Sequence, residues 1–220
     1  QLSAQVYHLR IQGTDLRNLS YIPGQHLRIF VGIGRDTAFR DNIRTYSVWQ
    51  YNATEGIIDL AICSHGGGIG SQWIKEIQVG EQIHFTGPKG KRFILDTTAD
   101  YYLFVGDLTA LAHLYEIRRH LPTQRASAGF VYTNYPNEIY TDLAPSDAFE
   151  FVPSQLPDLD ELKKKLHDFI TTQKGKGIVY LGGDGRVCVE LNHYFRKELG
   201  WSTAQIKTKP FWHPDKKGLE

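Results

Sequence analysis

The hydrophobic pattern of this chain changes its period once, near residues 97–101, and that change limits the folds open to it. Before it, apolar and polar residues alternate, as in residues 26–33 (HLRIFVGI), and this period of two is typical of half-buried strands. Turn signals such as IPG, NATEG and GPKG punctuate this part of the chain, and no long helix intervenes. The expected strands are 6–12, 26–33, 45–51, 56–63, 81–87 and 92–95. We therefore expect a closed or nearly closed antiparallel β-barrel of the Greek-key type.

The second half has the pattern of an α/β domain. Residues 101–106 (YYLFVG) are almost continuously apolar, as in a strand buried on both faces, and Leu111, Leu114 and Ile117 then recur at helical spacing. Two further strand and helix pairs are expected at 128–134 with 158–169, and at 177–183 with 187–199. Alternating strands and helices predict a parallel sheet. We expect two domains, residues 1–98 and 99–220.

The composition argues against several classes of protein. A formal net charge of +1 gives no electrostatic reason to expect nucleic acid, and no apolar run approaches the ~20 residues that span a bilayer. Cys63 and Cys188 are either one disulfide or two small buried residues, and two thiols cannot build a four-cysteine iron–sulfur site. The histidines lack metal-binding spacing, and most of them are expected at the surface or half-buried. We expect a cytoplasmic monomer and, because residue 1 is Gln, a preceding segment.

The stretch RTYSVW, residues 44–49, places polar groups in a strand where Val or Ile would pack more simply. Arg44 offers a rigid fork of donors suited to paired phosphates, and Tyr46 on the same strand face offers a flat ring for stacking. Ser47 points the other way and can donate a hydrogen bond. The alternative is an exposed Arg–Tyr pair on the barrel surface.

A glycine-rich loop, HGGGIGSQW at residues 65–73, follows the strand expected at 56–63. Glycines allow backbone to approach a ligand closely, and a short helix opening at Ser71 would present unpaired N–H groups to an anion. This pattern predicts a phosphate cradle, with a flexible barrel loop as the alternative.

Two strand-to-helix turns in the second half also carry glycine. In GDLTALAH, Gly106 lets backbone approach a ligand and Thr109 can cap the following helix, although a structural turn would look similar. In YLGGDGRVCVEL, Gly183, Gly185 and Cys188 fall one residue short of a dinucleotide fingerprint, and no acidic residue lies ~20 positions further on. We interpret the second as a tight turn that can line a pocket.

The ordered set of motifs resembles the ferredoxin–NADP reductase superfamily, and within it the siderophore-interacting proteins, which are flavin-dependent ferric-siderophore reductases. The matching pieces are RTYSVW, HGGGIGSQWI, GPKG, GDLTALAHL, GGDG and KPFWHPDKKG, and they span residues 22 to 218. The resemblance implies FAD held mainly by the barrel. It places Arg44 against the pyrophosphate, Tyr46 against the isoalloxazine and Ser47 near the reactive N5 edge.

The resemblance also implies the remaining site residues. The flavin contacts it assigns are Arg44, Thr45, Tyr46, Ser47, Ile62, His65, Gly66, Gly67, Gly68, Ile69, Gly70, Ser71 and Trp73. The NAD(P)H side comprises Gly106, Asp107, Thr109, Gly183, Asp184 and Trp212. Phe211 and Trp212 belong to an aromatic tail element that approaches the flavin. We expect a basic rim for an anionic chelate at Lys209, Lys216 and Lys217, with a solvated tail as the alternative.

The chain departs from the family pattern mostly on the pyridine-nucleotide side. The usual GDETALPA reads GDLTALAH, with Leu108 in place of the acid and Ala112 in place of the proline. The glycine loop has Ile69-Gly70 where Pro and a small residue are usual, and Asp184 stands where Glu is common. These changes leave the identity of the electron donor open, with NAD(P)H and reduced ferredoxin as the candidates. They affect the predicted flavin site less.

The function implied is reduction of ferric iron in a siderophore chelate, with FAD carrying the electrons and no side chain acting as acid or base on the iron. Hard oxygen ligands hold Fe(III) tightly and Fe(II) weakly, so one electron makes the ion releasable. One alternative is a general NAD(P)H-dependent flavin or ferredoxin reductase. Another is a non-catalytic nucleotide- or flavin-binding electron-relay module.

Overall fold

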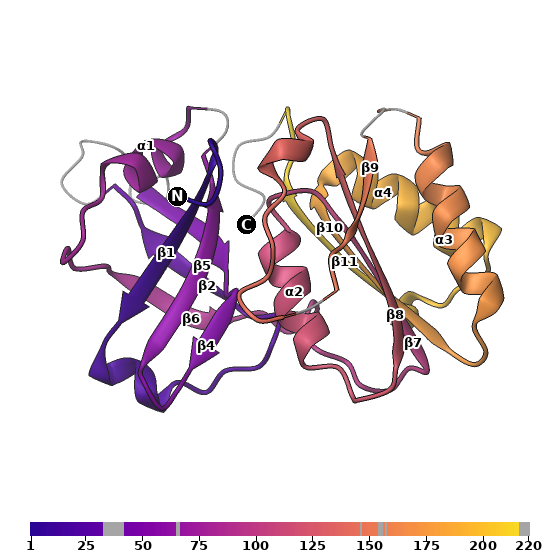
Figure 1. Cartoon of the computed structure of the whole chain (residues 1–220), viewed down its shortest axis with the longest axis horizontal. Helices are drawn as coiled ribbons and strands as arrows, with labels where there is room; N and C mark the ends of the chain where they lie inside the picture. The colour runs from indigo at the N-terminus through magenta and orange to yellow at the C-terminus, as the bar shows by residue number, and fades with distance from the viewer. Residues whose placement is uncertain (33–41, 65–66, 146, 154–155, 157, 216–220) are drawn as a thin grey trace.

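The structure is a computed structural model that describes residues 1–32, 42–64, 67–145, 147–153, 156 and 158–215. Figure 1 shows two groups of strands side by side, with one helix between them. The first group contains β1 to β6 and is antiparallel, and the second contains β7 to β11 and is parallel. The order expected from the change of period is therefore confirmed.

The N-terminal half is built from two three-stranded antiparallel sheets. The first has the order β1 (Val6–Gln12), β5 (Ile57–Cys63) and β4 (Gln50–Asn52), and the second has the order β3 (Ile43–Ser47), β2 (His26–Phe30) and β6 (Phe85–Lys89). The short helix α1 (Ile69–Glu76) follows β5. Leu27 and Ile29 are fully buried between the sheets, as their alternation predicts. The arrangement is barrel-like, with one apolar interior.

The C-terminal half is a five-stranded parallel sheet. Its order is β11 (Ile206–Trp212), β10 (Gly177–Asp184), β7 (Tyr101–Gly106), β8 (Ala126–Thr133) and β9 (Glu150–Pro153). Helix α2 (Leu111–Arg119) lies between this sheet and the N-terminal sheets, whereas α3 (Asp160–Thr172) and α4 (Gly185–His193) cover the other face (Figure 1). Short helical turns occur at Thr14–Asn18, Pro136–Glu138, Tyr194–Glu198 and Thr203–Gln205.

Strand β7 is buried on both faces, as its apolar run predicts. Tyr102 and Phe104 pack into the apolar cluster that includes α2, whereas Leu103 packs into the cluster beneath α3 and α4. Because successive side chains of a strand point to opposite faces, one strand supplies both layers. The Tyr102 and Phe104 face of β7 therefore lies toward α2 and the N-terminal half.

Five details differ from the sequence expectations. The strand expected at 45–51 is divided into β3 and β4, which belong to different sheets. The strand expected at 81–87 begins only at Phe85 and runs through the GPKG segment to Lys89. Residues 92–95 form no strand, because Phe93 is buried in the core between the halves and Leu95 donates its N–H to the carbonyl of Pro23. Strands β9 and β11 were not expected. Helix α3 begins at Asp160, two residues later than expected, and Asp158 accepts a hydrogen bond from the Asp160 N–H at 2.9 Å.

The two halves share one core. A single apolar cluster joins Val6, Trp49 and Phe93 of the first half to Leu111 and Leu114 of α2. A large shared core implies that the halves are held in one arrangement. The predicted domain boundary between residues 98 and 99 stays a prediction. Phe93, which precedes it, packs with residues of the second half.

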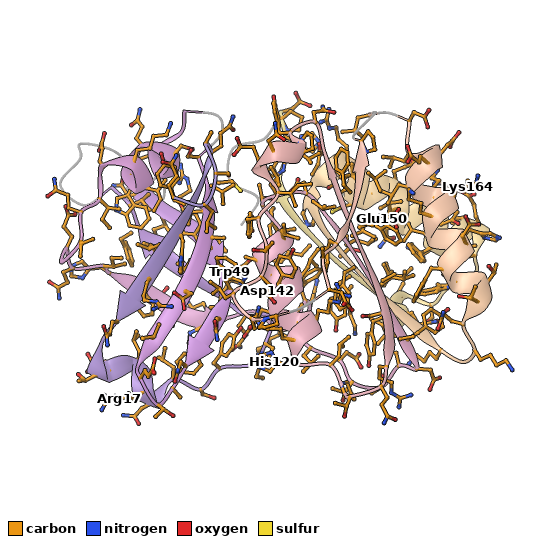
Figure 2. All side chains as sticks on the ribbon, in the orientation of Figure 1. Arg17, Trp49, His120, Asp142, Glu150 and Lys164 are labelled. Atoms are coloured by element: carbon orange, nitrogen blue, oxygen red, sulfur yellow. The ribbon has the colours of Figure 1, made fainter. Side chains whose placement is uncertain are left out.

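Polar groups cross the same junction. The indole N–H of Trp49 donates to Asp142 at 3.0 Å, and Figure 2 shows these two residues side by side where the halves meet. Arg119 donates to Asp142, to Glu116 and to the Trp49 carbonyl, and Tyr21 donates to Glu116 at 2.9 Å. The Glu116 and Asp142 carboxylates are buried, so this network ties α2 to the first half.

Cys63 and Cys188 are both free thiols, which removes the disulfide alternative. Among the described residues, no group of three or more His, Cys, Asp or Glu side chains could hold a metal ion. Within the same part of the chain, no helix has the length and apolar character needed to cross a bilayer.

Candidate functional site

Strand β3 and helix α1 meet at Gly70. Helix α1 begins at Ile69 with Gly68 as its N-cap, two residues earlier than the sequence predicted. Gly70 packs so closely that a Cβ there would lie 2.5 Å from the Tyr46 hydroxyl and 3.2 Å from Cγ of Arg44. The glycine-rich stretch and RTYSVW, which are separate motifs in the sequence, therefore form one structural unit.

Both β3 side chains are oriented by neighbouring groups. The Trp73 ring stacks on Tyr46 with centroids 6.2 Å apart and planes 20° apart. The Arg44 guanidinium donates to the carbonyl of Ile43 at 2.7 Å. Tyr46 and Arg44 thus approach the first turn of α1 from the same strand, and an aromatic ring and a permanent cation share one site.

The loop before α1 has room for a ligand. A Cβ on Gly67 or Gly68 would meet nothing within 4 Å, so the lack of side chains leaves open space there. Gly67 has a φ of +65°, a conformation that favours glycine. The first N–H groups of a helix have no intrahelical partner and attract anions. A cation, a flat ring and a helix N-terminus together fit a flavin with its diphosphate.

Ser47, the residue after Tyr46 in β3, contacts the second half of the molecule. Its Oγ lies 2.6 Å from Nδ1 of His113, and Nε2 of the same ring lies 3.2 Å from the carbonyl oxygen of Phe93. His113 belongs to α2 and is fully buried. His113 is thus an exception to the expectation that most histidines lie at the surface or half-buried.

Strand β11 contacts the His113 ring through Phe211. Phe211 lies 5.6 Å from it between ring centroids, and Lys209 sits 5.2 Å above the Phe211 ring. The Lys209 amine also lies 3.0 Å from Nδ1 of His26 on β2. Lys209, predicted as a substrate rim, therefore contacts both halves of the molecule. Lys216 and Lys217 lie outside the described residues.

Asp107 is the centre of the predicted NAD(P)H side. Its Oδ1 accepts hydrogen bonds from the N–H and hydroxyl of Thr109 at 2.8 and 2.5 Å. Its Oδ2 accepts from the N–H of Asp184 at 2.9 Å and from the indole of Trp212 at 2.7 Å. Asp107, Thr109, Asp184 and Trp212 are thus brought together, but the carboxylate already joins the ends of β7, β10 and β11.

The turns in this region have packing reasons for their residues. A Cβ on Gly106 would lie 2.8 Å from Ala110 and from Leu114, so close contact with α2 explains this glycine. Gly183 has a φ of +101° and packs against Asp107. Thr109 does not cap α2, because its hydroxyl is bound to Asp107 and the N-cap position is Ala110. The tight turn predicted at 182–185 is confirmed, since β10 leads directly into α4.

The other predicted flavin residues lie in different environments. Thr45 pairs with Arg28 across β2 and β3, and Ser71 is buried in α1. Ile62 is buried in the barrel interior, where its side chain packs in the core. His65 and Gly66 lie outside the described residues.

His113 was not among the predicted site residues. The available signal was small: GDLTALAH ends in His where the family pattern ends in Ala. A single histidine on an apolar helix face gives no indication that it reaches Ser47, more than sixty positions earlier and in the other half.

Comparisons with known proteins agree with this architecture. Residues 1–94 match the family described as oxidoreductase FAD-binding domain, and residues 99–215 match the family described as siderophore-interacting protein. Among solved structures, the siderophore-interacting protein SipS from Aeromonas hydrophila superposes with a TM-score of 0.78 at 18% identity, covering 99% of this chain and 89% of that one. The ferredoxin reductase of carbazole 1,9a-dioxygenase superposes with a TM-score of 0.74 at 19% identity, covering 96% of this chain and 66% of that one.

Curated relatives match over shorter stretches. The ferric vibriobactin reductase ViuB of Vibrio cholerae is 32% identical over 90 residues, which are 40% of this chain and 32% of that protein. An uncharacterised protein of Mycobacterium tuberculosis is 30% identical over 115 residues, 52% of this chain and 40% of that protein. The chain therefore matches a third to two fifths of the length of these relatives.

The chain thus has an antiparallel half that matches an oxidoreductase FAD-binding domain, followed by a parallel α/β half, and it shares this fold with the ferredoxin reductase structure. The family match over residues 99–215 covers more than half of the chain. The chain belongs to the siderophore-interacting protein family.

Proposed function

We propose that this protein holds FAD against Arg44, Tyr46 and the first turn of α1, and uses it to reduce ferric iron bound in a siderophore. The observation that carries the proposal is the close contact of Gly70 with Tyr46 and Arg44. That contact brings together the three kinds of group that a flavin dinucleotide needs. The match of residues 1–94 to an FAD-binding domain supports the same cofactor.

Each group has a role that follows from its chemistry. Arg44 neutralises the diphosphate with a bidentate fork, and the N–H groups at the start of α1 add donors to the same phosphates. Tyr46, oriented by Trp73, packs against the isoalloxazine ring. Ser47 faces the N5 edge. FAD, when bound, accepts a hydride and passes electrons singly, while the protein supplies orientation and electrostatics.

The proposed substrate follows from the family and from iron chemistry. Siderophores hold Fe(III) with hard oxygen ligands, and reduction to Fe(II) weakens that hold. The relative from Vibrio cholerae is described as a ferric vibriobactin reductase, which supports a ferric chelate as the electron acceptor. Lys209, which lies between His26 and Phe211, would attract an anionic chelate toward the junction of the halves.

The electron donor in this proposal is NAD(P)H or reduced ferredoxin, approaching the end of the parallel sheet where Asp107 and Trp212 lie. Both cysteines are free thiols, which fits a reducing compartment such as the cytoplasm. In this account residues 1–98 carry the flavin and residues 99–220 receive the electrons from the donor, within a monomer.

The test is an anaerobic reduction of a ferric chelate. Purified protein is loaded with FAD, photoreduced, and mixed with a ferric siderophore in the presence of a chelator that absorbs visible light only with Fe(II). We expect the flavin to reoxidise and to release about two Fe(II) per FAD, because each reduced flavin carries two electrons. Protein that binds FAD but yields no Fe(II) from any ferric chelate would contradict the proposed substrate. Protein that binds no FAD would contradict the proposed cofactor.

A further inference from the structure

The imidazole of His113 connects the two halves through contacts of both its nitrogens. Nδ1 lies 2.6 Å from Oγ of Ser47 on β3, and Nε2 lies 3.2 Å from the carbonyl oxygen of Phe93. The ring is fully buried and packs against the aromatic rings of Phe93 and Phe211, whose centroids lie 4.9 and 5.6 Å away. These contacts fix the orientation of the ring.

The partners of the ring decide which nitrogen carries the proton. A carbonyl oxygen can only accept, so Nε2 must donate to Phe93. A neutral imidazole has one N–H, and Nδ1 is then left with a lone pair. The contact with Ser47 must consequently be donated by the serine hydroxyl. Ser47 gives its only proton to His113 and presents oxygen lone pairs elsewhere.

The surroundings keep this histidine neutral. Burial lowers the pKa of the His113 imidazole well below its ordinary value, and the charge of Lys209 on β11 and that of His26 on β2 lower the pKa further. Hydrogen bonds to the carbonyls of Phe93 and Gly24 raise the pKa of His113, but the net shift is still downward. If both nitrogens of the ring were protonated, Nδ1 would donate to Oγ of Ser47. The serine hydroxyl would then be able to donate its hydrogen bond to another group. At neutral pH that reversal is disfavoured.

We propose that His113 is a positioning residue that makes Ser47 a hydrogen-bond acceptor toward N5 of the flavin, an inference that rests on the proposed function. Oxidised isoalloxazine has a lone pair at N5, whereas the reduced ring has an N–H there. A hydroxyl whose proton is held by His113 can accept from the reduced ring but cannot donate to the oxidised one. The arrangement therefore favours the reduced flavin.

The first test reads the tautomer in the chain without flavin. Nitrogen NMR of the imidazole separates the protonated from the unprotonated nitrogen, and we expect Nε2 protonated and Nδ1 unprotonated at pH 7. A proton on Nδ1, or on both nitrogens, would overturn the proposal. This measurement uses the unmodified chain, so its result does not depend on whether a variant folds.

The second test measures the flavin midpoint potential in His113→Phe, Ser47→Ala and the double variant. His113→Phe keeps a flat ring but frees the serine proton to bond oxidised N5. We expect about a tenfold fall in the ratio of reduced to oxidised flavin at a fixed potential, which for two electrons is about 30 mV. In the Ser47→Ala background, His113→Phe should have no further effect.

A matched control separates this role from a structural one. Tyr115→Phe removes a buried hydrogen bond in the same helix, from Tyr115 to the carbonyl of Tyr140 at 3.1 Å, without touching Ser47. It should lower stability and leave the potential unchanged. Flavin that binds with the same potential in wild type and His113→Phe would overturn the positioning role alone. Failure of the wild type to bind flavin would overturn the proposed function itself.

Discussion

The indole Nε1 of Trp212 donates a hydrogen bond to Oδ2 of Asp107 at 2.7 Å, joining the end of β11 to the residue that follows β7. These strands are not neighbours, because β10 lies between them in the sheet. The N–H of Asp184, at the end of β10, donates to the same oxygen at 2.9 Å. One buried carboxylate thus aligns the carboxyl ends of three strands beside the candidate site.

This relationship predicts that Asp107→Asn destabilises the protein. An amide offers one acceptor oxygen, and its NH₂ group would face N–H donors, leaving at least one buried donor unpaired. We expect the free energy of unfolding to fall by about 2–3 kcal/mol, measured by urea denaturation. The control is Asp147→Asn, where the carboxylate is exposed. A loss at Asp107 no larger than at Asp147 would show that the carboxylate does not hold the strands together.

The buried ion network at the junction of the halves supports a second prediction. Arg119→Met would leave the Glu116 and Asp142 carboxylates buried without their cation. Breaking a buried pair in this way costs about 3–5 kcal/mol, which urea denaturation would detect. Arg125→Met is the control, because the pair of Arg125 with Asp100 is about half exposed and should contribute less than about 1 kcal/mol. Equal losses would refute the structural role of Arg119.

Asp96 predicts a pH dependence of stability. Burial raises the pKa of the Asp96 carboxyl, but hydrogen bonds from Lys207 and Thr98 outweigh it and lower the pKa to about 2, from an ordinary value of 3.8. A carboxyl whose pKa is lower in the folded state than in the unfolded state stabilises the folded protein. This contribution is complete above the unfolded-state pKa and is lost as the pH falls through the folded-state pKa. The stability difference between wild type and Asp96→Asn should therefore be constant above about pH 5 and shrink between about pH 4 and 2. A difference that is unchanged at pH 2 would contradict this assignment.

Periodic patterns explain which parts of the fold could be predicted. Leu27 and Ile29 alternate as the interior of a sheet requires, and the apolar run of β7 indicates burial on both faces. Strand β11 was not predicted from the sequence, because it lies at a sheet edge, carries three lysine or threonine side chains in succession and includes Pro210. Residues 92–95 look like a strand locally, but Phe93 packs into a core shared by both halves, which no local pattern reveals.

The candidate site likewise has features that could be predicted from the sequence and features that could not. Arg44, Tyr46 and the glycines could be named from the sequence because their chemistry is specific. The contact of Gly70 with Tyr46 could not, since it depends on how α1 folds back on β3. Thr109 suits a helix cap, yet its hydroxyl binds Asp107 instead. His113 acts through partners that lie far away in the sequence.

The most direct test of the proposed flavin site is a titration of flavin-free protein with FAD, for wild type and two glycine variants. Binding is monitored by the quenching of flavin fluorescence. We expect wild type to bind one FAD per chain. In Gly70→Ala the added Cβ would lie 2.5 Å from the Tyr46 hydroxyl and displace α1 from β3, so FAD affinity should fall. We expect about a tenfold loss or more, equivalent to about 1.4 kcal/mol. Gly13→Ala is the matched control, because its Cβ would meet only Leu16 at 3.8 Å, and its affinity should equal that of wild type. Wild type that binds no FAD, or Gly70→Ala that binds it equally well, would contradict the proposed site.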